Sequence, residues 1–286
     1  MSIKKRTWAA ACLALLALAP PAGTAEVRLR FSTAVEKLRY GAADLGVAGW
    51  AEEIKLRTST FSNLEFISQT VGELKLGYGF EGELQFLLSR RFGIGLSGGY
   101  AYGSLPEEKA LTLSVWDGVT YYHTKPAKMS AYPVLASAYI FLPIGRRVDL
   151  YLKGGAGFVF AKFVGREGLR KPDEKNYFYT LFETATARRG AYAGGLGLSF
   201  DLDDSLGFFL EADLRSARVD GFDGEDNLMQ AGRLYAYEQF IPDLGLWQPK
   251  IHVLPQAPEG AEFREVREAS LDLGGYGARL GVMLRF

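Results

Sequence analysis

The chain is poor in cysteine and histidine and has no excess of charge of either sign. Its 286 residues include 1 Cys and 2 His, and 33 Lys and Arg are balanced by 33 Asp and Glu. A balanced chain lacks the electrostatic signature of a nucleic-acid-binding protein. With 48% hydrophobic residues it is also unlike a disordered protein. The composition therefore predicts a folded protein that does not bind nucleic acid.

The N-terminal segment has the pattern of a secretory signal peptide. Three basic residues at 4–6 precede an apolar run over 8–19, and small residues follow as far as Ala25. The sequence thus divides into a signal peptide, 1–25, and an exported chain, 26–286. The only cysteine, Cys12, lies in the signal peptide, so disulfides and cysteine-bound metals are excluded from the exported chain.

No apolar run in the sequence reaches the roughly 20 residues that a membrane-spanning helix requires. The chain is instead rich in glycine and aromatic residues, with 34 Gly, 19 Phe and 15 Tyr against 11 Pro. Such a composition favours many strands joined by tight turns. The sequence therefore predicts an all-β protein.

Strict alternation of apolar with polar or small residues supports this prediction. It is clearest from Tyr276 to Phe286, where every second residue is apolar. Eight segments are expected to be strands: 27–36, 74–88, 92–103, 131–142, 148–160, 194–200, 206–215 and 276–286. In the fourth of these segments both parities are apolar, and the pattern does not decide which faces outward.

Segment 74–88 is longer than an ordinary soluble strand of about five or six residues. It also exceeds the roughly nine to eleven residues that cross a bilayer at a tilt. In the next segment, 92–103, one face is mostly glycine, which predicts close packing in a narrow barrel beside bulky side chains such as Glu81 and Glu83.

The connections between these segments alternate between short and long. The short ones are 89–91, 143–147 and 201–205, and the long ones are 37–71, 104–130, 164–190 and 216–269. Outer-membrane barrels have short turns at the periplasmic end, long loops at the other end and an even number of strands. A soluble β-sandwich or a lipocalin-like carrier is the competing architecture, since alternation alone fits both.

With its terminal Tyr-x-Ala-x-Leu-x-Val-x-Leu-x-Phe strand, signal peptide and loop rhythm, the chain resembles small Gram-negative outer-membrane β-barrels such as the OmpA transmembrane domain and OmpX. The resemblance covers 26–286 and implies an eight-stranded antiparallel up-and-down barrel in the outer membrane. It also implies an assembly signal for the barrel-assembly machinery at Tyr276, Leu280, Val282, Leu284 and Phe286. Because this fold hosts anchors, adhesins, conduits and lipid enzymes, it does not decide the activity.

The longest connection contains two further apolar segments, 234–237 and 251–254. If both crossed the membrane, the barrel would have ten strands. Glu238, Pro249 and His252 make them poor spanning strands, so the sequence favours an external hairpin.

The inward parity of the predicted strands collects charged residues. The set is Arg28, Arg30, Lys75, Glu81, Glu83, Lys153, Glu211, Asp213, Arg215 and Arg279. Burying any of them unpaired would cost several kcal/mol, so we expect a network of ion pairs. An eight-stranded barrel is just wide enough for side chains to fill, which favours a plug over a gate or ion path.

The sequence offers little for catalysis or metal binding. Its two histidines, His123 and His252, fall in predicted loops and have no nucleophile at a characteristic spacing. An acidic stretch at 220–226 lacks the calcium-loop pattern and is expected to be solvated. The sequence therefore predicts no enzyme activity, no metal and no cofactor.

The expected partners are outer-membrane lipids and the assembly machinery. Basic residues near the aromatic residues 177–179, namely Arg166, Arg170, Lys171 and Lys175, suit lipopolysaccharide phosphates, although the sequence slightly favours an ordinary solvated loop. The resulting hypothesis is a non-enzymatic structural or surface-interaction protein. A narrow channel is the first alternative, and a lipid-modifying outer-membrane enzyme is the second.

Overall fold

The structure is a computed structural model that describes residues 26–39, 42–60, 62–72, 76–172, 174 and 176–286. The predicted signal peptide, 1–25, and two of the predicted site residues, Lys75 and Lys175, lie outside the described residues.

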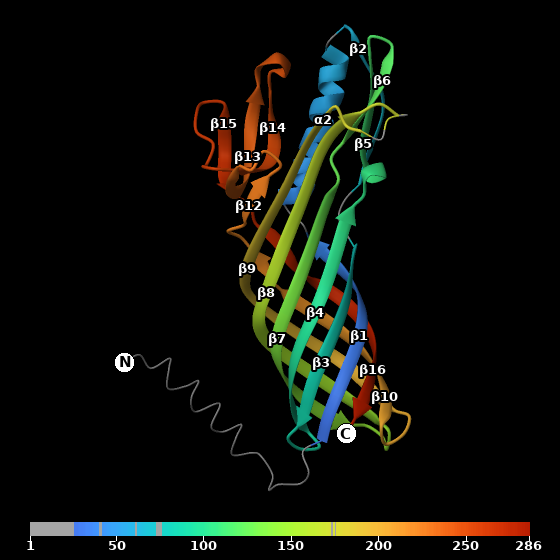
Figure 1. Ribbon diagram of the computed structural model, residues 1–286. Coiled ribbons are helices and arrows are strands. Elements are labelled where there is room, and N and C mark those ends of the chain that lie inside the picture. Colours follow the sequence, from blue (N-terminus) through green and yellow to red (C-terminus); the bar gives the residue numbers. More distant parts are fainter. Residues whose placement is uncertain (1–25, 40–41, 61, 73–75, 173, 175) are drawn as a thin grey trace, which may run out of the picture.

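Eight antiparallel strands close into a ring (Figure 1). In order around the ring they are β1 (Glu26–Arg39), β3 (Leu76–Leu87), β4 (Phe92–Leu105), β7 (Ala127–Pro143), β8 (Val148–Arg170), β9 (Tyr179–Asp201), β10 (Leu206–Ser216) and β16 (Leu271–Arg285). The pairing of β1 with β16 joins the two ends of the chain, and the pairing of β8 with β9 completes the circle. The predicted eight-stranded antiparallel barrel is confirmed.

Side-chain parity follows the alternation of the sequence. On β10, for example, residues alternate between buried and exposed along nearly the whole strand. The strand left open by the sequence, β7, places Tyr139 and Phe141 inside at 1% and 2% exposure, whereas Tyr132 and Ile140 face outward. The inward and outward faces of β7, which the sequence pattern left undecided, are therefore determined by packing inside the barrel.

The glycines of the inner face make room for bulky lumen side chains. A Cβ atom at Gly95 would overlap the Glu83 carboxylate, and one at Gly197 would overlap the Tyr151 ring. The same argument does not apply to outward-facing Gly98, because a Cβ there would meet nothing within 4 Å. Glycine is thus required at specific inner positions of this narrow barrel.

The two ends of the barrel differ in structure. Turns 88–91, 144–147 and 202–205 lie at one end, together with the start of β1 and the end of β16 (Figure 1). Val27 and Phe286 exchange backbone hydrogen bonds there, at 3.4 and 2.9 Å. At the opposite end β8 and β9 extend to 23 residues each and project beyond their neighbours.

The long connections were expected to be loops, but they are largely folded. Their elements are α2 (Ala42–Thr60), β2 (Leu64–Val71), η1 (Glu107–Lys109), β5 (Ala110–Trp116), β6 (Val119–Thr124), β11 (Arg218–Val219), β12 (Asp223–Asp226), β13 (Ala231–Ile241), η2 (Pro242–Leu244), β14 (Leu246–Leu254) and β15 (Phe263–Glu268). We call these elements together the loop module. Strands β13 and β14 pair as an external hairpin outside the ring, as the sequence favoured.

Helix α2 packs between the two halves of the loop module, against β14 on one side and β2 on the other (Figure 1). Its close approach to β14 depends on two glycines, since a Cβ at Gly46 would overlap Ile251 and one at Gly49 would overlap Pro249. Val47 and Trp50 are each 2% exposed. Among the described residues, no helix is long and apolar enough to cross a membrane.

The interior of the barrel is built in three layers, which can be followed along β8. Near the short turns lies an aromatic cluster of Leu87, Tyr139, Phe141, Tyr151, Phe209 and Met283. Two residues beyond Tyr151, Lys153 begins a charged layer. Further along, Val159, Ala161 and Phe163 belong to an apolar core shared with the loop module. The charged layer is thus enclosed between two apolar layers.

Candidate functional site

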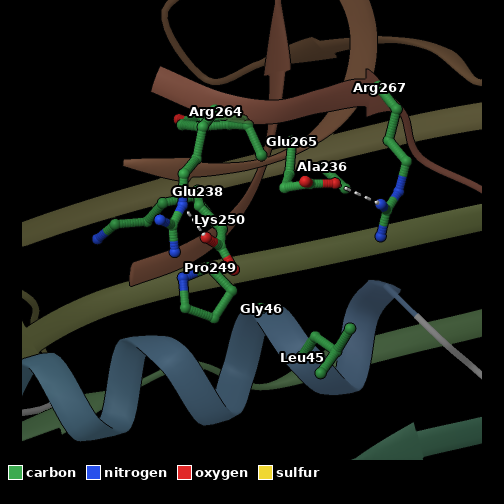
Figure 2. Close-up of a pocket in the computed structure, with 10 residues that line it drawn as sticks. Leu45, Gly46, Ala236, Glu238, Pro249, Lys250, Arg264, Glu265 and Arg267 are labelled. Atoms are coloured by element: carbon green, nitrogen blue, oxygen red, sulfur yellow. Dashed lines mark hydrogen bonds and ion pairs between the residues drawn. The ribbon is translucent and has the colours of Figure 1, made fainter. Parts of the chain in front are cut away.

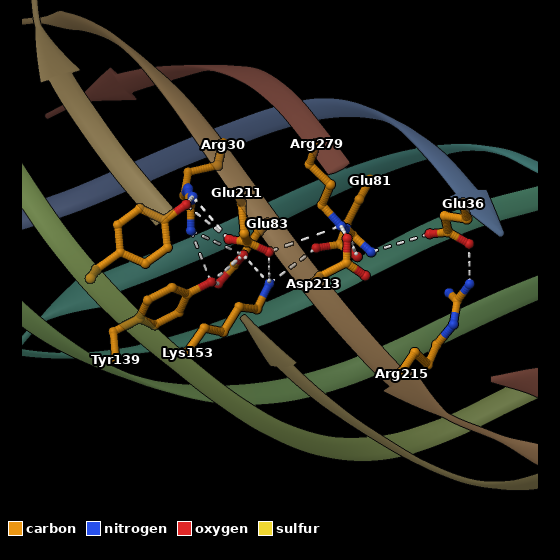
Figure 3. A network of polar contacts seen from close by, with 11 residues as sticks. Arg30, Glu36, Glu81, Glu83, Tyr139, Lys153, Glu211, Asp213, Arg215 and Arg279 are labelled. Carbon is orange, nitrogen blue, oxygen red and sulfur yellow. Dashed lines mark hydrogen bonds and ion pairs between the residues drawn. The ribbon is translucent and has the colours of Figure 1, made fainter. Parts of the chain in front are cut away.

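Charged side chains from five strands converge in the middle of the lumen (Figure 3). We define the charged layer as Arg30, Glu36, Glu81, Glu83, Lys153, Glu211, Asp213, Arg215 and Arg279. Strand register brings opposite charges together, since Arg30 lies directly across from Glu83 and Glu211 directly across from Arg279. Cross-strand neighbours on one face are only about 5 Å apart at Cβ, so these pairs follow from the closed register.

Arg30 occupies the end of the layer nearest the aromatic cluster. Its guanidinium donates to the hydroxyl of Tyr139 at 2.9 Å and to that of Tyr151 at 2.5 Å. Each hydroxyl in turn donates to a carboxylate, Tyr139 to Glu83 at 2.5 Å and Tyr151 to Glu211 at 2.9 Å. The guanidinium carbon also lies 3.8 Å from the centre of the Phe209 ring. The cation is therefore held by a hydrogen-bonded relay and by aromatic faces.

Lys153 and Arg279 link the acids of the central part. The Lys153 ammonium lies 3.2 Å from Glu83 and 3.3 Å from Glu81. Arg279 reaches Glu81 at 2.6 Å, Asp213 at 3.1 Å and, with another nitrogen, Glu36 at 3.5 Å. Arg279 is accordingly the most connected cation of the layer.

The far end of the layer is formed by Arg215 and Glu36. Arg215 is ion-paired with Glu36 and donates to the backbone carbonyl of Leu273 at 3.2 Å. Figure 3 shows this pair at one end of the network and Arg30 at the other.

The layer is buried and internally satisfied. None of its nine charged side chains is more than 9% exposed. Among these nine described residues, none has a buried side-chain nitrogen or oxygen without a hydrogen-bond partner. Four cations face five anions, and the two tyrosine hydroxyls supply further donors to the carboxylates. Mutual pairing is what makes such burial tolerable.

Little open space remains within the layer. A cavity beside Glu36, Glu81 and Arg279 has a volume of about 10 Å³. A second, beside Arg30, Lys153 and Glu211, has a volume of about 0 Å³. A water molecule requires roughly 10–15 Å³ measured in this way. These two cavities within the charged layer are therefore no larger than a single water molecule.

The structure brings together eight of the ten charged residues singled out from the sequence: Arg30, Glu81, Glu83, Lys153, Glu211, Asp213, Arg215 and Arg279. Arg28 is separate, because it lies one rung closer to the short turns, where it pairs with Glu26 at 2.6 Å and stacks over Phe141. Lys75 is outside the described residues.

Sequence reasoning missed Glu36, Tyr139 and Tyr151 as members of this network. Glu36 lies on the same inward face of β1 as Arg30, so its place in the lumen could have been predicted from the alternation. Tyr151 shares the parity of Lys153 on β8. Tyr139 could not be predicted, because the sequence did not decide which face of β7 points inward. Its burial is seen only in the closed barrel.

Four residues attributed to the assembly signal, Tyr276, Leu280, Val282 and Leu284, lie on the outer face of β16, between 36% and 62% exposed. Phe286 follows the strand and is 74% exposed.

The two histidines were expected to be solvated loop residues, but the structure places both of them in strands. His123 lies on β6, and its Nε2 is 2.8 Å from the hydroxyl of Ser114, which is 1% exposed. Burial lowers the pKa of His123 to about 4. His252 lies on β14, with Nδ1 3.2 Å from Glu183, which also accepts from the backbone of Val253. His123 thus links β6 to β5 within the loop module, and His252 links β14 to the ring strand β9.

The basic loop residues are also engaged. Arg170 pairs with Glu107 at 2.9 Å, and Arg166 stacks over Tyr177 at 3.9 Å. In the acidic stretch Asp220 is paired with Arg189, while Asp226 accepts from the backbone of a turn. Across the described part of the chain, no group of three or more His, Cys, Asp or Glu residues is arranged to hold a metal ion.

A pocket of about 390 Å³ lies in the loop module between α2 and the β13–β15 strands (Figure 2). Its walls include Leu45 of α2, Pro249 and Lys250. Arg264 is bound to Glu238 at 2.5 Å at its edge. The pocket is separate from the charged layer.

No protein-family model and no curated protein matches the chain. The chain is an eight-stranded antiparallel β-barrel. Among solved structures it is similar to Ail of Yersinia pestis, crystallised with the heparin analogue sucrose octasulfate, at 13% identity over 92% of this chain and 99% of that one, with a TM-score of 0.37. OprG of Pseudomonas aeruginosa is similar at 11% identity, over 92% and 96%, with a TM-score of 0.38.

The outer membrane protease OmpT of Escherichia coli is also similar, at 8% identity over 92% of this chain and 96% of that one, with a TM-score of 0.25. These likenesses concern the fold alone, and the closed ring of strands establishes that fold without them.

Proposed function

We propose that this protein spans the outer membrane as a non-conducting barrel and acts, without catalysis, as a structural or surface-interaction protein through its loop module. The observation that carries the proposal is the charged layer, whose paired side chains leave cavities of only about 10 and 0 Å³. A barrel filled in this way is suited to anchoring the loop module in the membrane.

The outer face of the ring supports the membrane placement. Large apolar side chains on all eight strands are exposed, among them Phe31, Phe80, Leu96, Leu152 and Leu210 at between 48% and 60%. In water such a belt would be unfavourable, whereas hydrocarbon matches it. A closed ring also leaves no unpaired strand edge, as the bilayer requires.

Two closures in series block the lumen. The charged layer is the first, and the apolar core between the barrel and the loop module is the second, with Leu105, Val219 and Leu271 each at most 1% exposed. An ion would have to disrupt the paired charges and then cross an apolar interior. This arrangement favours the plug over the narrow channel.

The loop module is the part offered to the surroundings. It holds α2, the β2–β5–β6 strands and the β12–β15 strands, and it is folded rather than a set of independent loops. Its Ser114–His123 pair does not favour an enzyme, because the serine hydroxyl of such a pair must be reachable by substrate and Ser114 is 1% exposed.

The placement can be tested by labelling single cysteines in intact cells. The exported chain has no cysteine, so Met229→Cys in the loop module, at a residue 90% exposed, gives one reactive thiol. Ile144→Cys, in a short turn and at a residue 64% exposed, is the matched control. We expect a membrane-impermeant maleimide to label the first variant in intact cells and the second only after the outer membrane is permeabilised.

Labelling of Ile144→Cys but not Met229→Cys in intact cells would reverse the orientation and contradict the surface role. Recovery of the unmodified protein in the soluble fraction would contradict the membrane placement altogether.

A further inference from the structure

Three basic side chains lie on the outer face of the barrel, at the border between the apolar belt and the loop module. They are Lys128 on β7, Lys162 on β8 and Arg188 on β9, and all three are exposed. None of them forms an ion pair with a described residue. The outward positions of the same three strands, the even-numbered residues of 128–142, 148–166 and 182–200, contain no acidic residue.

Strand register makes the three cations neighbours. Lys128 is opposite Val164, two residues from Lys162, and Lys162 is opposite Thr186, two residues from Arg188. Such diagonal neighbours are roughly 7–8 Å apart. The three side chains therefore form one continuous basic patch, close enough for adjacent cations to share one anionic group.

Aromatic rings place this patch at the level of lipid headgroups. The Arg188 guanidinium carbon lies 4.3 Å from the centre of the Phe158 ring and 5.2 Å from that of Phe160. Tyr132, directly opposite Phe160, is 48% exposed. Aromatic girdles mark the interface between hydrocarbon and headgroups in outer-membrane barrels. The stacking also orients the guanidinium over the barrel wall.

Directly below the patch, the outer wall carries large apolar side chains, those of Tyr132, Val134, Phe158 and Phe160, which are between 43% and 49% exposed. Farther towards the centre of the belt the outward residues are small: Ala136, Ala138, Gly154, Ala156 and Gly194. A Cβ atom at Gly154 would meet nothing within 4 Å. The outer wall is thus apolar from the cations to the centre of the belt, which suits contact with a hydrocarbon chain.

We propose that Lys128, Lys162 and Arg188 bind the phosphate of a membrane lipid whose acyl chain packs against the apolar wall below them. Cations beside hydrocarbon are costly unless they reach a counter-charge, and the outward positions of β7, β8 and β9 provide none. The adjacent acid on β12, Asp223, lies opposite Thr186 and is 3.5 Å from another cation, Arg233. The apolar wall selects a lipid over free phosphate. The inference rests on the membrane placement proposed above, but not on whether the lumen conducts.

Binding can be measured with the refolded exported chain, 26–286, in dodecylmaltoside by microscale thermophoresis. The probes are dioleoyl phosphatidic acid, dioleoylglycerol, which has the same chains without phosphate, and inorganic phosphate. The test variant is Lys128→Gln/Lys162→Gln/Arg188→Gln. The charge-matched control, Lys55→Gln/Arg264→Gln/Arg267→Gln, removes three exposed cations of the loop module.

We expect the unmodified protein to bind phosphatidic acid at least 10-fold more tightly than dioleoylglycerol or inorganic phosphate. The test variant should lose about 30- to 100-fold, which at about 1.4 kcal/mol per factor of ten is roughly 1 kcal/mol per cation. The control should stay within about 2-fold, and Lys128→Arg/Lys162→Arg/Arg188→Lys should retain binding. Heat-dependent gel mobility verifies that each variant is folded.

Equal affinity for the two lipids, equal loss in both triple variants, or binding of inorganic phosphate as tight as that of the phospholipid would each overturn the inference. Those outcomes leave the proposed function standing if the protein still inserts into bilayers. Failure of the unmodified chain to insert would instead refute the membrane placement.

Discussion

Replacement of Arg279 by methionine is the most informative single perturbation of the charged layer. Arg279 lies within 4 Å of four carboxylates, those of Glu36, Glu81, Glu211 and Asp213. Arg279→Met leaves these acids facing three cations in a site that is nearly closed to water. Removing one partner of a buried ion pair typically costs about 3–5 kcal/mol, because the remaining charge stays buried.

We expect Arg279→Met to lower the free energy of unfolding by roughly that amount. The double variant Arg279→Met/Glu81→Met should recover part of the loss, because it removes the closest unpaired acid together with the cation. Arg264→Met breaks an exposed pair with Glu238 and serves as the control, with an expected cost of at most about 1 kcal/mol.

The assay is urea unfolding in lipid vesicles, followed by heat-dependent gel mobility. Tryptophan fluorescence alone is unsuitable, because Trp50, Trp116 and Trp247 all belong to the loop module and report on its unfolding rather than on that of the barrel. A loss for Arg279→Met no greater than that for Arg264→Met, or a further loss in the double variant, would refute the reasoning that the layer is stabilised by mutual pairing.

Three further predictions address glycine packing, pH dependence and assembly. Gly95→Ala should destabilise the barrel by about 1–3 kcal/mol, because its Cβ overlaps Glu83, whereas Gly98→Ala, with nothing within 4 Å, should be close to neutral in the same urea assay. His123 stays neutral in the fold down to about pH 4, while an unfolded histidine binds its proton near pH 6.5, so its stabilising contribution is present above pH 6.5 and is lost as the pH falls towards 4. The free energy of unfolding, followed by tryptophan fluorescence, should therefore fall over that pH range in the unmodified protein and fall less steeply in His123→Gln. Parallel pH dependences of the two free energies would contradict this prediction. Deletion of Phe286 should reduce the amount of folded barrel in the outer membrane, as read by gel mobility, and undiminished insertion would remove its assignment to the assembly signal.

The barrel was predictable because membrane crossing imposes a repeated pattern. Alternation over 276–286 and the short turns at 143–147 and 201–205 follow from a lipid-facing belt and a hairpin topology, and both are local properties of the sequence. The structure bears them out in the register of β16 and in the turns that join β7 to β8 and β9 to β10.

The loop module was not predictable by the same reasoning. Helix α2 lacks a clear apolar stripe and is held by glycine contacts with β14, whose residues are roughly 200 positions away in the sequence. His123 and Ser114 meet only because β5 and β6 pair. Long-range packing, rather than local periodicity, determines this part of the fold.

The charged layer lies between these two cases. Parity indicated which charges enter the lumen, but height along the barrel decides which of them meet. Arg28 and Arg30 share one face of β1, yet only Arg30 reaches the layer, because one rung of the sheet separates them. Tyr139 completes the network from a strand whose phase the sequence left open.

The central claim, that the charged layer closes the lumen, is tested most directly by single-channel recording of refolded residues 26–286 in a planar bilayer. The account predicts insertion without conductance steps for the unmodified protein. Glu83→Ala, which deprives Arg30 and Lys153 of a partner, should lower stability and is the variant in which any leak is expected first. Reproducible conductance steps from the unmodified protein would contradict the account and establish the barrel as a narrow channel.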